Sequence, residues 1–177
     1  MRLERLAARL LAVLLLLGAA AAARADAWEG FFAPFLGDLR GELAEAKASG
    51  RKGVVVMYHF DDCPYCQRMK KEVLARRDVQ DWYGREFVVL GIDTRGAQPI
   101  TGIDGTVRPE NEHARAMGVR STPTFDFLAL DGERLYRHVG GLYDPAEFLL
   151  LGHYVADGAH RTQSFTAYVR SQLKKGN

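Results

Sequence analysis

Two cysteines are the residues of this sequence best suited to chemistry. Cys63 and Cys66 are the only cysteines among 177 residues, and Pro64 and Tyr65 separate them. Two thiols at this spacing can form a reversible disulfide, or they can supply two ligands to a metal ion. The pair therefore indicates redox chemistry or metal binding. The predicted secondary structure around the cysteines is needed to distinguish the two.

The flanking residues place Cys63 between a strand and a helix. Residues 53–60, GVVVMYHF, are a β-branched and aromatic run that is typical of a strand buried on both faces. Residues 66–77, CQRMKKEVLARR, have helical spacing, with apolar residues on one side. Unpaired N–H groups and the helix dipole stabilise a thiolate at a helix N-terminus, where Pro64 is also well tolerated. We therefore expect an attacking thiolate at Cys63 and a less exposed resolving thiol at Cys66.

The rest of the chain alternates strands and helices. Further strands are indicated at residues 87–93, 124–130 and 134–139, the last two joined by the hairpin-turn signal Asp131-Gly132. The order β-α-β-α-β-β-α predicts an α/β fold, with a mixed central β-sheet flanked by helices on both faces. The other predicted helices are residues 38–49, residues 78–87 with Asp78 as the cap, residues 109–119 with Pro109 in the first turn, residues 144–159 and residues 164–175.

Two segments lie outside this alternation. Residues 26–37 are aromatic and interrupted by glycine and proline, so we expect a docked N-terminal segment. Residues 94–108, TRGAQPITGIDGTVR, form an excursion that contains Asp104-Gly105, another hairpin-turn signal. We divide the chain into a signal peptide at 1–25, an N-terminal segment and helix at 26–50, and a main domain at 51–177.

Residues 1–25 have the pattern of a cleavable signal peptide. A basic start is followed by 14 apolar residues at 10–23, and Ala23-Arg24-Ala25 puts small residues at the cleavage site. An uncleaved anchor stays open as an alternative, although a membrane span uses about 20 apolar residues. The formal net charge is +2, and residues 1–25 carry four arginines and one glutamate, so the remainder has a net charge of −1. We therefore expect a periplasmic protein that does not bind nucleic acid.

A second pattern, downstream of the cysteines, carries a resemblance. Ser121-Thr122-Pro123-Thr124 leads into the predicted hairpin. Together with the order strand–Cys-Pro-Tyr-Cys–helix, it resembles the thioredoxin superfamily. In that family the proline entering the hairpin strand is cis and faces the dithiol, so the resemblance implies a cis bond before Pro123. It also implies that the Thr122 backbone meets an extended substrate segment.

The similarity is closer to one group, the SoxW-like periplasmic thioredoxins associated with bacterial sulfur oxidation. It covers roughly residues 50–160. It rests on the segments CPYCQRMKKEVL, FVVLGID, PITGIDG, ARAMGVRSTPTFDFLALDG and GGLYDPAEFLLLGHYVADGA. The resemblance implies a thioredoxin-like fold, with Cys63 and Cys66 as catalytic residues. It makes Pro64, Tyr65, Thr122 and Pro123 the candidate substrate-binding residues, although the ring of Tyr65 equally fits a plain exposed helix position.

Three features depart from thioredoxins proper. Asp62 stands before Cys63 where those proteins have tryptophan, and the dipeptide between the cysteines is Pro-Tyr. The buried aspartate that assists the resolving thiol is replaced by Met57. Asp61 or Asp62 could substitute for it, but we expect both to be exposed, where their charge opposes a thiolate at Cys63.

Interpretations of the same residues without redox catalysis stay open. The two cysteines could form a purely structural bridge, or they could bind a metal together with His59. A tetrahedral zinc site needs a fourth ligand, so we expect His59 to pack at the end of its strand and predict no metal site. Covalent haem attachment is excluded because Gln67, not histidine, follows the second cysteine. Gly140-Gly141 either lets backbone pass near the dithiol or forms a plain loop.

The predicted function is a thiol–disulfide oxidoreductase without a cofactor. As a reductase, the Cys63 thiolate attacks a disulfide in a protein substrate and Cys66 resolves the mixed disulfide. A membrane thiol-electron transporter is the expected reductant, and we expect a monomer. The alternatives are a disulfide oxidase or isomerase that uses the same pair, and a non-enzymatic thiol metallochaperone.

Overall fold

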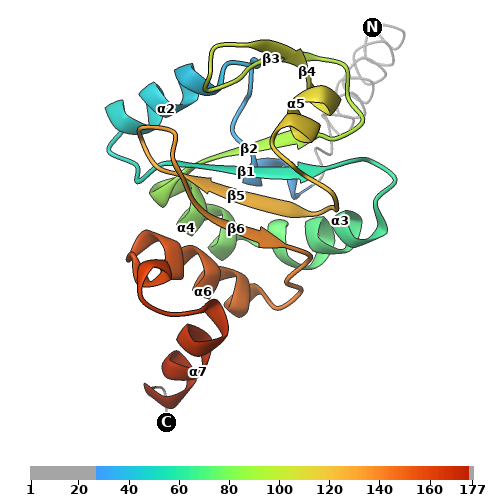
Figure 1. The fold of residues 1–177 in the computed structure, drawn as a ribbon. Helices are drawn as coiled ribbons and strands as arrows, with labels where there is room; N and C mark the ends of the chain where they lie inside the picture. Colours follow the sequence, from blue (N-terminus) through green and yellow to red (C-terminus); the bar gives the residue numbers. More distant parts are fainter. Residues whose placement is uncertain (1–26, 176–177) are drawn as a thin grey trace, which may run out of the picture.

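A four-stranded sheet forms the centre of the protein (Figure 1). A computed structural model describes residues 27–175, so the predicted signal peptide lies outside the described residues. The strand order is β2-β1-β5-β6, in which β1 runs parallel to β2 and antiparallel to β5, and β5 runs antiparallel to β6. This confirms the predicted mixed sheet. The strands are β1 (Val54–His59), β2 (Val88–Asp93), β5 (Thr124–Leu128) and β6 (Arg134–Val139).

Helices cover both faces of this sheet, as predicted. In Figure 1, α2 and α5 lie above the sheet, and α4 and α6 lie below it. Within residues 27–175, no helix combines the length and apolar character that a membrane crossing requires. The helices are η1 (Glu29–Phe31), α2 (Leu39–Ala48), α3 (Pro64–Met69), η2 (Lys70–Leu74), α4 (Arg77–Glu86), α5 (Glu110–Ala116), α6 (Pro145–Ala156), η3 (Ala159–Arg161) and α7 (Phe165–Lys175).

Strand β1 is buried on both sides and separates two layers of core. Val55 and Met57 pack in the layer that also contains Cys63 and Cys66, which we call the dithiol face. Tyr58 packs in the other layer with residues of α2 and α5, which we call the opposite face. Successive side chains of a strand point to opposite sides, so the continuous apolar run of β1 supplies both layers at once.

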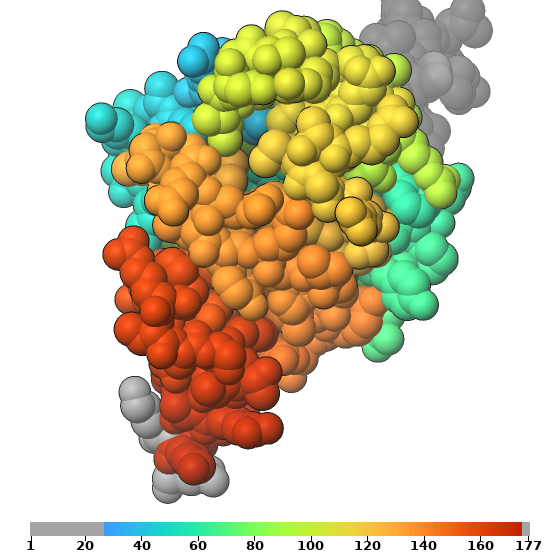
Figure 2. All heavy atoms as spheres, viewed as in Figure 1, coloured from blue at the N-terminus to red at the C-terminus, as the bar shows by residue number. Residues whose placement is uncertain are grey.

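The excursion at residues 94–108 forms a hairpin of its own. Strands β3 (Pro99–Thr101) and β4 (Val107–Pro109) pair antiparallel as a separate two-stranded sheet. Gly105 has φ +78° at the turn, which confirms the Asp104-Gly105 turn signal. The space-filling view in Figure 2 shows this hairpin and α5 side by side over the upper part of the molecule, next to the β5–β6 hairpin.

The predicted boundaries of the middle helices were wrong at two places. The segment at residues 66–77 is not one regular helix, because α3 continues at Lys70 as the π-helix η2, which ends at Leu74. Lys70, the first residue of η2, is buried, and its ammonium lies 4.0 Å above the ring of Trp28. The next helix starts at Arg77 after an extended Arg76, so Asp78 lies in the first turn and does not cap it.

A buried ion pair, which the sequence did not predict, joins the sheet to α5. Asp126 of β5 is fully buried, and its two carboxylate oxygens each accept a 2.6 Å hydrogen bond from Arg137 of β6. Arg137 also donates to the Met117 carbonyl at the C-terminus of α5, at 2.9 Å. Bidentate geometry and this additional bond offset the cost of desolvating the two charges.

We expect Arg137→Met to lower the free energy of unfolding by about 3 kcal/mol, because it leaves the Asp126 carboxylate buried without its partner. Urea denaturation measures the change. Arg134→Gln is the matched control, since Arg134 lies 3.6 Å from Asp126 and is half-exposed. It should cost less than about 1 kcal/mol. An Arg137→Met protein as stable as the parent would contradict the structural role assigned to this pair.

Candidate active site

Cys63 lies where the sequence predicted it, between β1 and the helix that follows. It is the N-cap residue of α3, with extended backbone angles, and Pro64 occupies the first helical position. The two cysteines are joined in a disulfide, with 5.2 Å between their Cα atoms. The Cys63 sulfur accepts a hydrogen bond from the backbone N–H of Cys66 at 3.1 Å. The sulfur thus takes the position of a capping oxygen at the positive end of the helix dipole.

A second donor reaches the same sulfur from a distant part of the chain. The Thr122 hydroxyl donates to the Cys63 sulfur at 3.2 Å, across a sequence separation of 59 residues. The Thr122–Pro123 peptide bond is cis, as the resemblance implied. Tertiary structure therefore brings Thr122 and its neighbour Pro123 to the Cys63-Pro64-Tyr65-Cys66 segment, so the six predicted site residues lie in one region.

The site residues differ in exposure. Cys63 is 2% exposed and Cys66 is fully buried, so the predicted difference between the two thiols is small in the disulfide form. Pro64 is exposed, and the Tyr65 ring is 65% exposed beside the dithiol. A substrate contact by Tyr65 stays a prediction, because an exposed ring is expected under either interpretation.

A small cleft opens beside Thr122. Its volume is about 150 Å³, and Phe60, Val119 and Arg120 are among the residues that line it. The Arg95 guanidinium covers the Phe60 ring at 3.6 Å from the ring centre. The sequence did not single out these residues, because they become neighbours only when the loops after β1, β2 and α5 meet.

Backbone of the Gly140-Gly141 segment borders the other side of the site. The Gly140 N–H donates to the Pro123 carbonyl at 2.9 Å, and Gly140 has φ +103°, a conformation that favours glycine. The neighbouring Val139 is 57% exposed and pairs in register with Thr124. The bond to Pro123 places Gly140 beside the segment that leads into β5, and a close approach of this backbone to the dithiol stays a prediction.

The acids near the dithiol are exposed, as expected. Asp61 and Asp62 lie at the surface, and Met57 is fully buried where thioredoxins have an aspartate. Among the described residues the one buried carboxylate belongs to Asp126. Asp126 is on the opposite face of the sheet, because it pairs in register with Val56 of that layer. No carboxylate in the described chain replaces the missing buried aspartate.

His59 packs at the end of β1, as predicted. Its ring lies 6.0 Å from that of Phe32, between centroids, and its Nδ1 is buried without a hydrogen-bond partner. Burial, and then the nearby Lys70 ammonium, lower the pKa of His59 to about 4. His59 is therefore neutral at pH 7. Within residues 27–175 no group of three or more His, Cys, Asp or Glu side chains could hold a metal ion.

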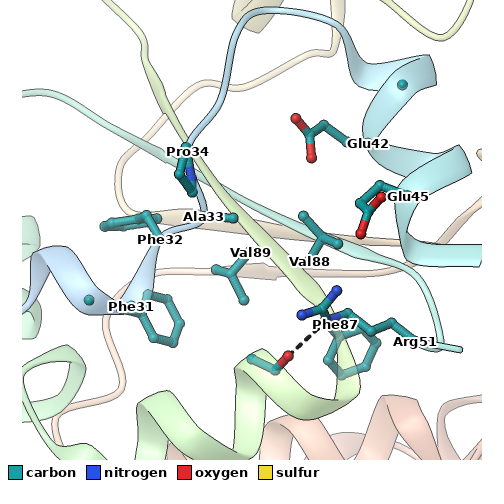
Figure 3. Close-up of a pocket in the computed structure, with 13 residues that line it drawn as sticks. Phe31, Phe32, Ala33, Pro34, Glu42, Glu45, Arg51, Phe87, Val88 and Val89 are labelled. Atoms are coloured by element: carbon teal, nitrogen blue, oxygen red, sulfur yellow. Dashed lines mark hydrogen bonds between the residues drawn. The ribbon is translucent and has the colours of Figure 1, made fainter. Parts of the chain in front are cut away.

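A larger recess lies away from the dithiol, between α2 and the edge strand β2. It has a volume of about 490 Å³ and contains none of the predicted site residues. In Figure 3, Glu42 and Glu45 of α2 stand opposite Val88, and Arg51 donates to the Gly84 carbonyl at 2.8 Å. Burial, followed by the charges of Glu45 and Asp38, raises the pKa of Glu42. The recess offers acidic groups but no nucleophile, so it does not compete with the dithiol as an active site.

Comparison with known proteins gives matches to one family. The family model of the thioredoxin-like domain matches residues 39–156. Anterior gradient protein 3 of Mus musculus is 28% identical over 102 residues, which span 56% of this chain and 56% of that protein. The chain thus spans little more than half the length of this curated relative.

Solved structures show the same fold. A thioredoxin-fold protein from Helicobacter pylori superposes with a TM-score of 0.63 at 16% identity, over 83% of this chain and 94% of that one. A thioredoxin from Thermus thermophilus is 33% identical, with a TM-score of 0.51 over 65% of this chain and 81% of that one. A putative disulphide-isomerase from Bacteroides thetaiotaomicron is 26% identical, with a TM-score of 0.54 over 75% of this chain and 94% of that one.

Thr122→Val should slow alkylation of the reduced protein by iodoacetamide at pH 7 by about tenfold. The change keeps the shape of the side chain but removes the hydroxyl that donates to the Cys63 sulfur. A hydrogen bond to a charged group contributes roughly 1.5–3 kcal/mol, of which 1.4 kcal/mol already corresponds to a factor of about ten. Thr94→Val is the control, since Thr94 lines the same cleft without bonding the sulfur. Equal rates in the two variants would show that the hydroxyl does not stabilise the thiolate.

His59→Phe should reduce the amount by which the free energy of unfolding falls on acidification. The pKa of His59 is about 4 in the folded state and about 6.5 in an unfolded chain, so the unfolded state binds the extra proton between these values. The contribution of the neutral His59 to the free energy of unfolding is therefore fully present above pH 6.5, and it is lost as the pH falls towards 4. Urea denaturation at pH 7.5 and pH 4.5 should show a loss smaller by about 2 kcal/mol in the variant. Parallel losses would contradict a buried, neutral His59.

Proposed function

The chain belongs to the thioredoxin-like family, and from this we propose that it is an exported thiol–disulfide oxidoreductase that reduces disulfides in periplasmic proteins. One observation carries the proposal: the Cys63 sulfur at the start of α3 receives two hydrogen bonds, from the Cys66 N–H and the Thr122 hydroxyl. In the reduced protein the same donors favour the thiolate at Cys63 over the thiol. That thiolate is the attacking nucleophile of disulfide exchange.

The reaction runs in two exchange steps. The Cys63 thiolate attacks one sulfur of the substrate disulfide, which forms a mixed disulfide and releases the other substrate sulfur as a thiolate. The Cys66 thiol loses its proton and attacks the Cys63 sulfur, which releases the second substrate thiolate and forms the Cys63–Cys66 disulfide. Two electrons pass to the substrate, and the two protons of the dithiol end on the substrate thiols. An external dithiol then restores the reduced form.

The surroundings of Pro123 offer a place for an extended protein segment. The cleft beside Thr122 is lined by Phe60, Val119 and Arg120, and Val139, which pairs in register with Thr124, is 57% exposed. Tyr65, which stands between the two cysteines, is 65% exposed. Backbone contacts to Thr122, beside a cleft with both polar and apolar lining residues, would hold an extended segment with little selectivity for its side chains. This favours protein disulfides over a small-molecule substrate.

Export and a membrane electron donor are part of the same proposal. Residues 1–25 have the basic start, apolar run and small residues of a signal peptide. The periplasm holds no soluble reductant of its own, so a membrane thiol-electron transporter would recharge the dithiol of a monomeric carrier. Similarity to SoxW-like thioredoxins in the segments around Cys63 and Pro123 supports the direction of a reductase.

The second candidate is a disulfide oxidase or isomerase with the same residues. The putative disulphide-isomerase from Bacteroides thetaiotaomicron favours it, because that protein is 26% identical and superposes over 75% of this chain. The geometry at Cys63 serves both directions, since exchange is reversible. The reduction potential separates the two candidates.

Cys66→Ser should accumulate mixed disulfides with partner proteins, whereas Cys63→Ser should accumulate none, because only Cys63 has two donors on its sulfur. Each variant is expressed with residues 1–25 in a Gram-negative host, and the periplasmic fraction is analysed by non-reducing gels and mass spectrometry. Trapping by Cys63→Ser alone would show that the two thiols have the opposite roles. Recovery of the whole chain in the cytoplasm would contradict export.

Equilibration with glutathione buffers should give a reduction potential below about −200 mV, in the range of reducing proteins of this type. The fraction of oxidised dithiol is measured by alkylation and mass spectrometry. Cys66→Ser, which cannot form the disulfide, serves as the blank. A potential near −120 mV, as for a strong oxidant, would favour the oxidase and contradict the reductase.

A further inference from the structure

A cavity lies on the opposite face of the sheet from the dithiol. Its volume is about 460 Å³, it is partly open to solvent, and it is lined by residues of α2, the β3–β4 hairpin, α5 and the end of the β5–β6 hairpin. Figure 2 shows the β3–β4 hairpin and α5 on the outside of this part of the molecule. The walls are mostly apolar, and they include Leu39, Tyr58, Ile103, Met117 and Leu128. The predicted redox reaction uses none of these residues.

His113 of α5 is the polar residue that most requires an explanation in this cavity. It lines the cavity, is only 2% exposed, and neither ring nitrogen has a hydrogen-bond partner. Buried polar side chains nearly always have a partner, and each one left unpaired costs about 1–3 kcal/mol. Burial, and then the charge of Arg108, lower the pKa of His113, so the ring is neutral at pH 7. A neutral imidazole has one donor and one acceptor, and in His113 both are left without a partner.

The two charged side chains of the cavity, Arg108 and Asp104, neutralise each other. Arg108 donates to both carboxylate oxygens of Asp104, at 3.3 and 2.9 Å. The lining therefore has no net formal charge. A ligand with a charged head group would have to compete with Asp104 or Arg108 for its counter-ion, which is unfavourable. A head group that matches the neutral imidazole is a neutral one that can both donate and accept, such as a hydroxyl.

The hairpin that closes the cavity is packed tightly around it. A side-chain carbon at Gly102 would lie 2.8 Å from Asp104 Oδ1 and 3.6 Å from His113 Nδ1. At Gly132, where φ is +88°, it would lie 2.7 Å from the Ile103 side chain. A side chain at either glycine would therefore disturb the packing of the β3–β4 hairpin against α5 and the β5–β6 turn around the cavity.

We propose that this cavity binds a small neutral amphiphile, whose apolar body packs against Ile103, Met117 and Leu128 and whose hydroxyl group hydrogen-bonds His113. A cavity of this volume holds a substituted phenol or a medium-chain alcohol. The proposal concerns the opposite face of the sheet and does not depend on the redox function.

The test compares two probes of nearly the same shape, 4-ethylphenol and 4-ethylbenzoate, at pH 7.5. At this pH the phenol is neutral and the benzoate is ionised. Titrations of the full chain followed by 1H–15N NMR should show saturable shifts at Ile103, His113 and Met117 with 4-ethylphenol. The benzoate should bind at least tenfold more weakly. Absence of saturable binding of the phenol, or equal affinity of the two probes, would overturn the proposal.

Variants assign the binding to the cavity. His113→Leu keeps an apolar side chain but removes both nitrogens, and should weaken 4-ethylphenol binding by about tenfold, as for one hydrogen bond to a buried group. Ala116→Phe leaves His113 in place and fills the cavity from an exposed helix position, so it should abolish binding even if His113→Leu fails to fold. His153→Leu on α6 is the matched histidine control and should bind like the parent. Undiminished binding by Ala116→Phe would place the phenol elsewhere and overturn the proposal.

Discussion

The antiparallel pairing of β1 with β5 is the constraint on which the site depends. Its register sets Tyr58 opposite Thr124, so the end of β1 lies beside the start of β5. Cys63 follows the end of β1, and Thr122 and Pro123 precede β5. The Thr122 hydroxyl can reach the Cys63 sulfur only because this register is fixed by side chains buried on both faces of the two strands. A shift of one residue would turn those side chains to the wrong layers.

The electrostatics of the dithiol follow from this arrangement. Both donors to the Cys63 sulfur are held by rigid elements, the first turn of α3 and the segment leading into β5. Met57 contributes packing but no proton acceptor beneath them. The buried carboxylate of Asp126 is used on the other side of the sheet, where Arg137 neutralises it. Stabilisation of the thiolate therefore rests on hydrogen bonds and the helix N-terminus rather than on a buried acid.

The two faces of the sheet are chemically separate. The dithiol face carries the cysteines and the helices α3, α4 and α6, and its core is largely aromatic and aliphatic. The opposite face carries α2, α5 and the β3–β4 hairpin, and it holds the buried ion pair and the cavity at His113. A ligand in the cavity would contact the residues that connect α5 to the sheet and would leave the dithiol accessible to substrate.

The sequence by itself determined the elements and the chemistry of the pair. Continuous apolar runs predicted β1 and β2, turn signals at Asp104-Gly105 and Asp131-Gly132 predicted two hairpins, and the position of Cys63 before a helix predicted an N-terminal thiol. These features are local, because periodicity, turn conformation and helix ends involve residues close together in the chain.

Only the tertiary structure decided which distant residues meet. The bond from Thr122 to Cys63 and the cleft at Phe60 depend on strand order and register. The pairing of Asp126 with Arg137, and the unpartnered nitrogens of His113, depend on how α5 packs on the sheet. The π-helix at Lys70, where the sequence predicted a regular helix, is likewise a feature that local periodicity did not reveal. Contacts between segments far apart in the chain leave no periodic pattern in the sequence. Each segment on its own is consistent with its local secondary structure, so its sequence does not reveal the distant partner.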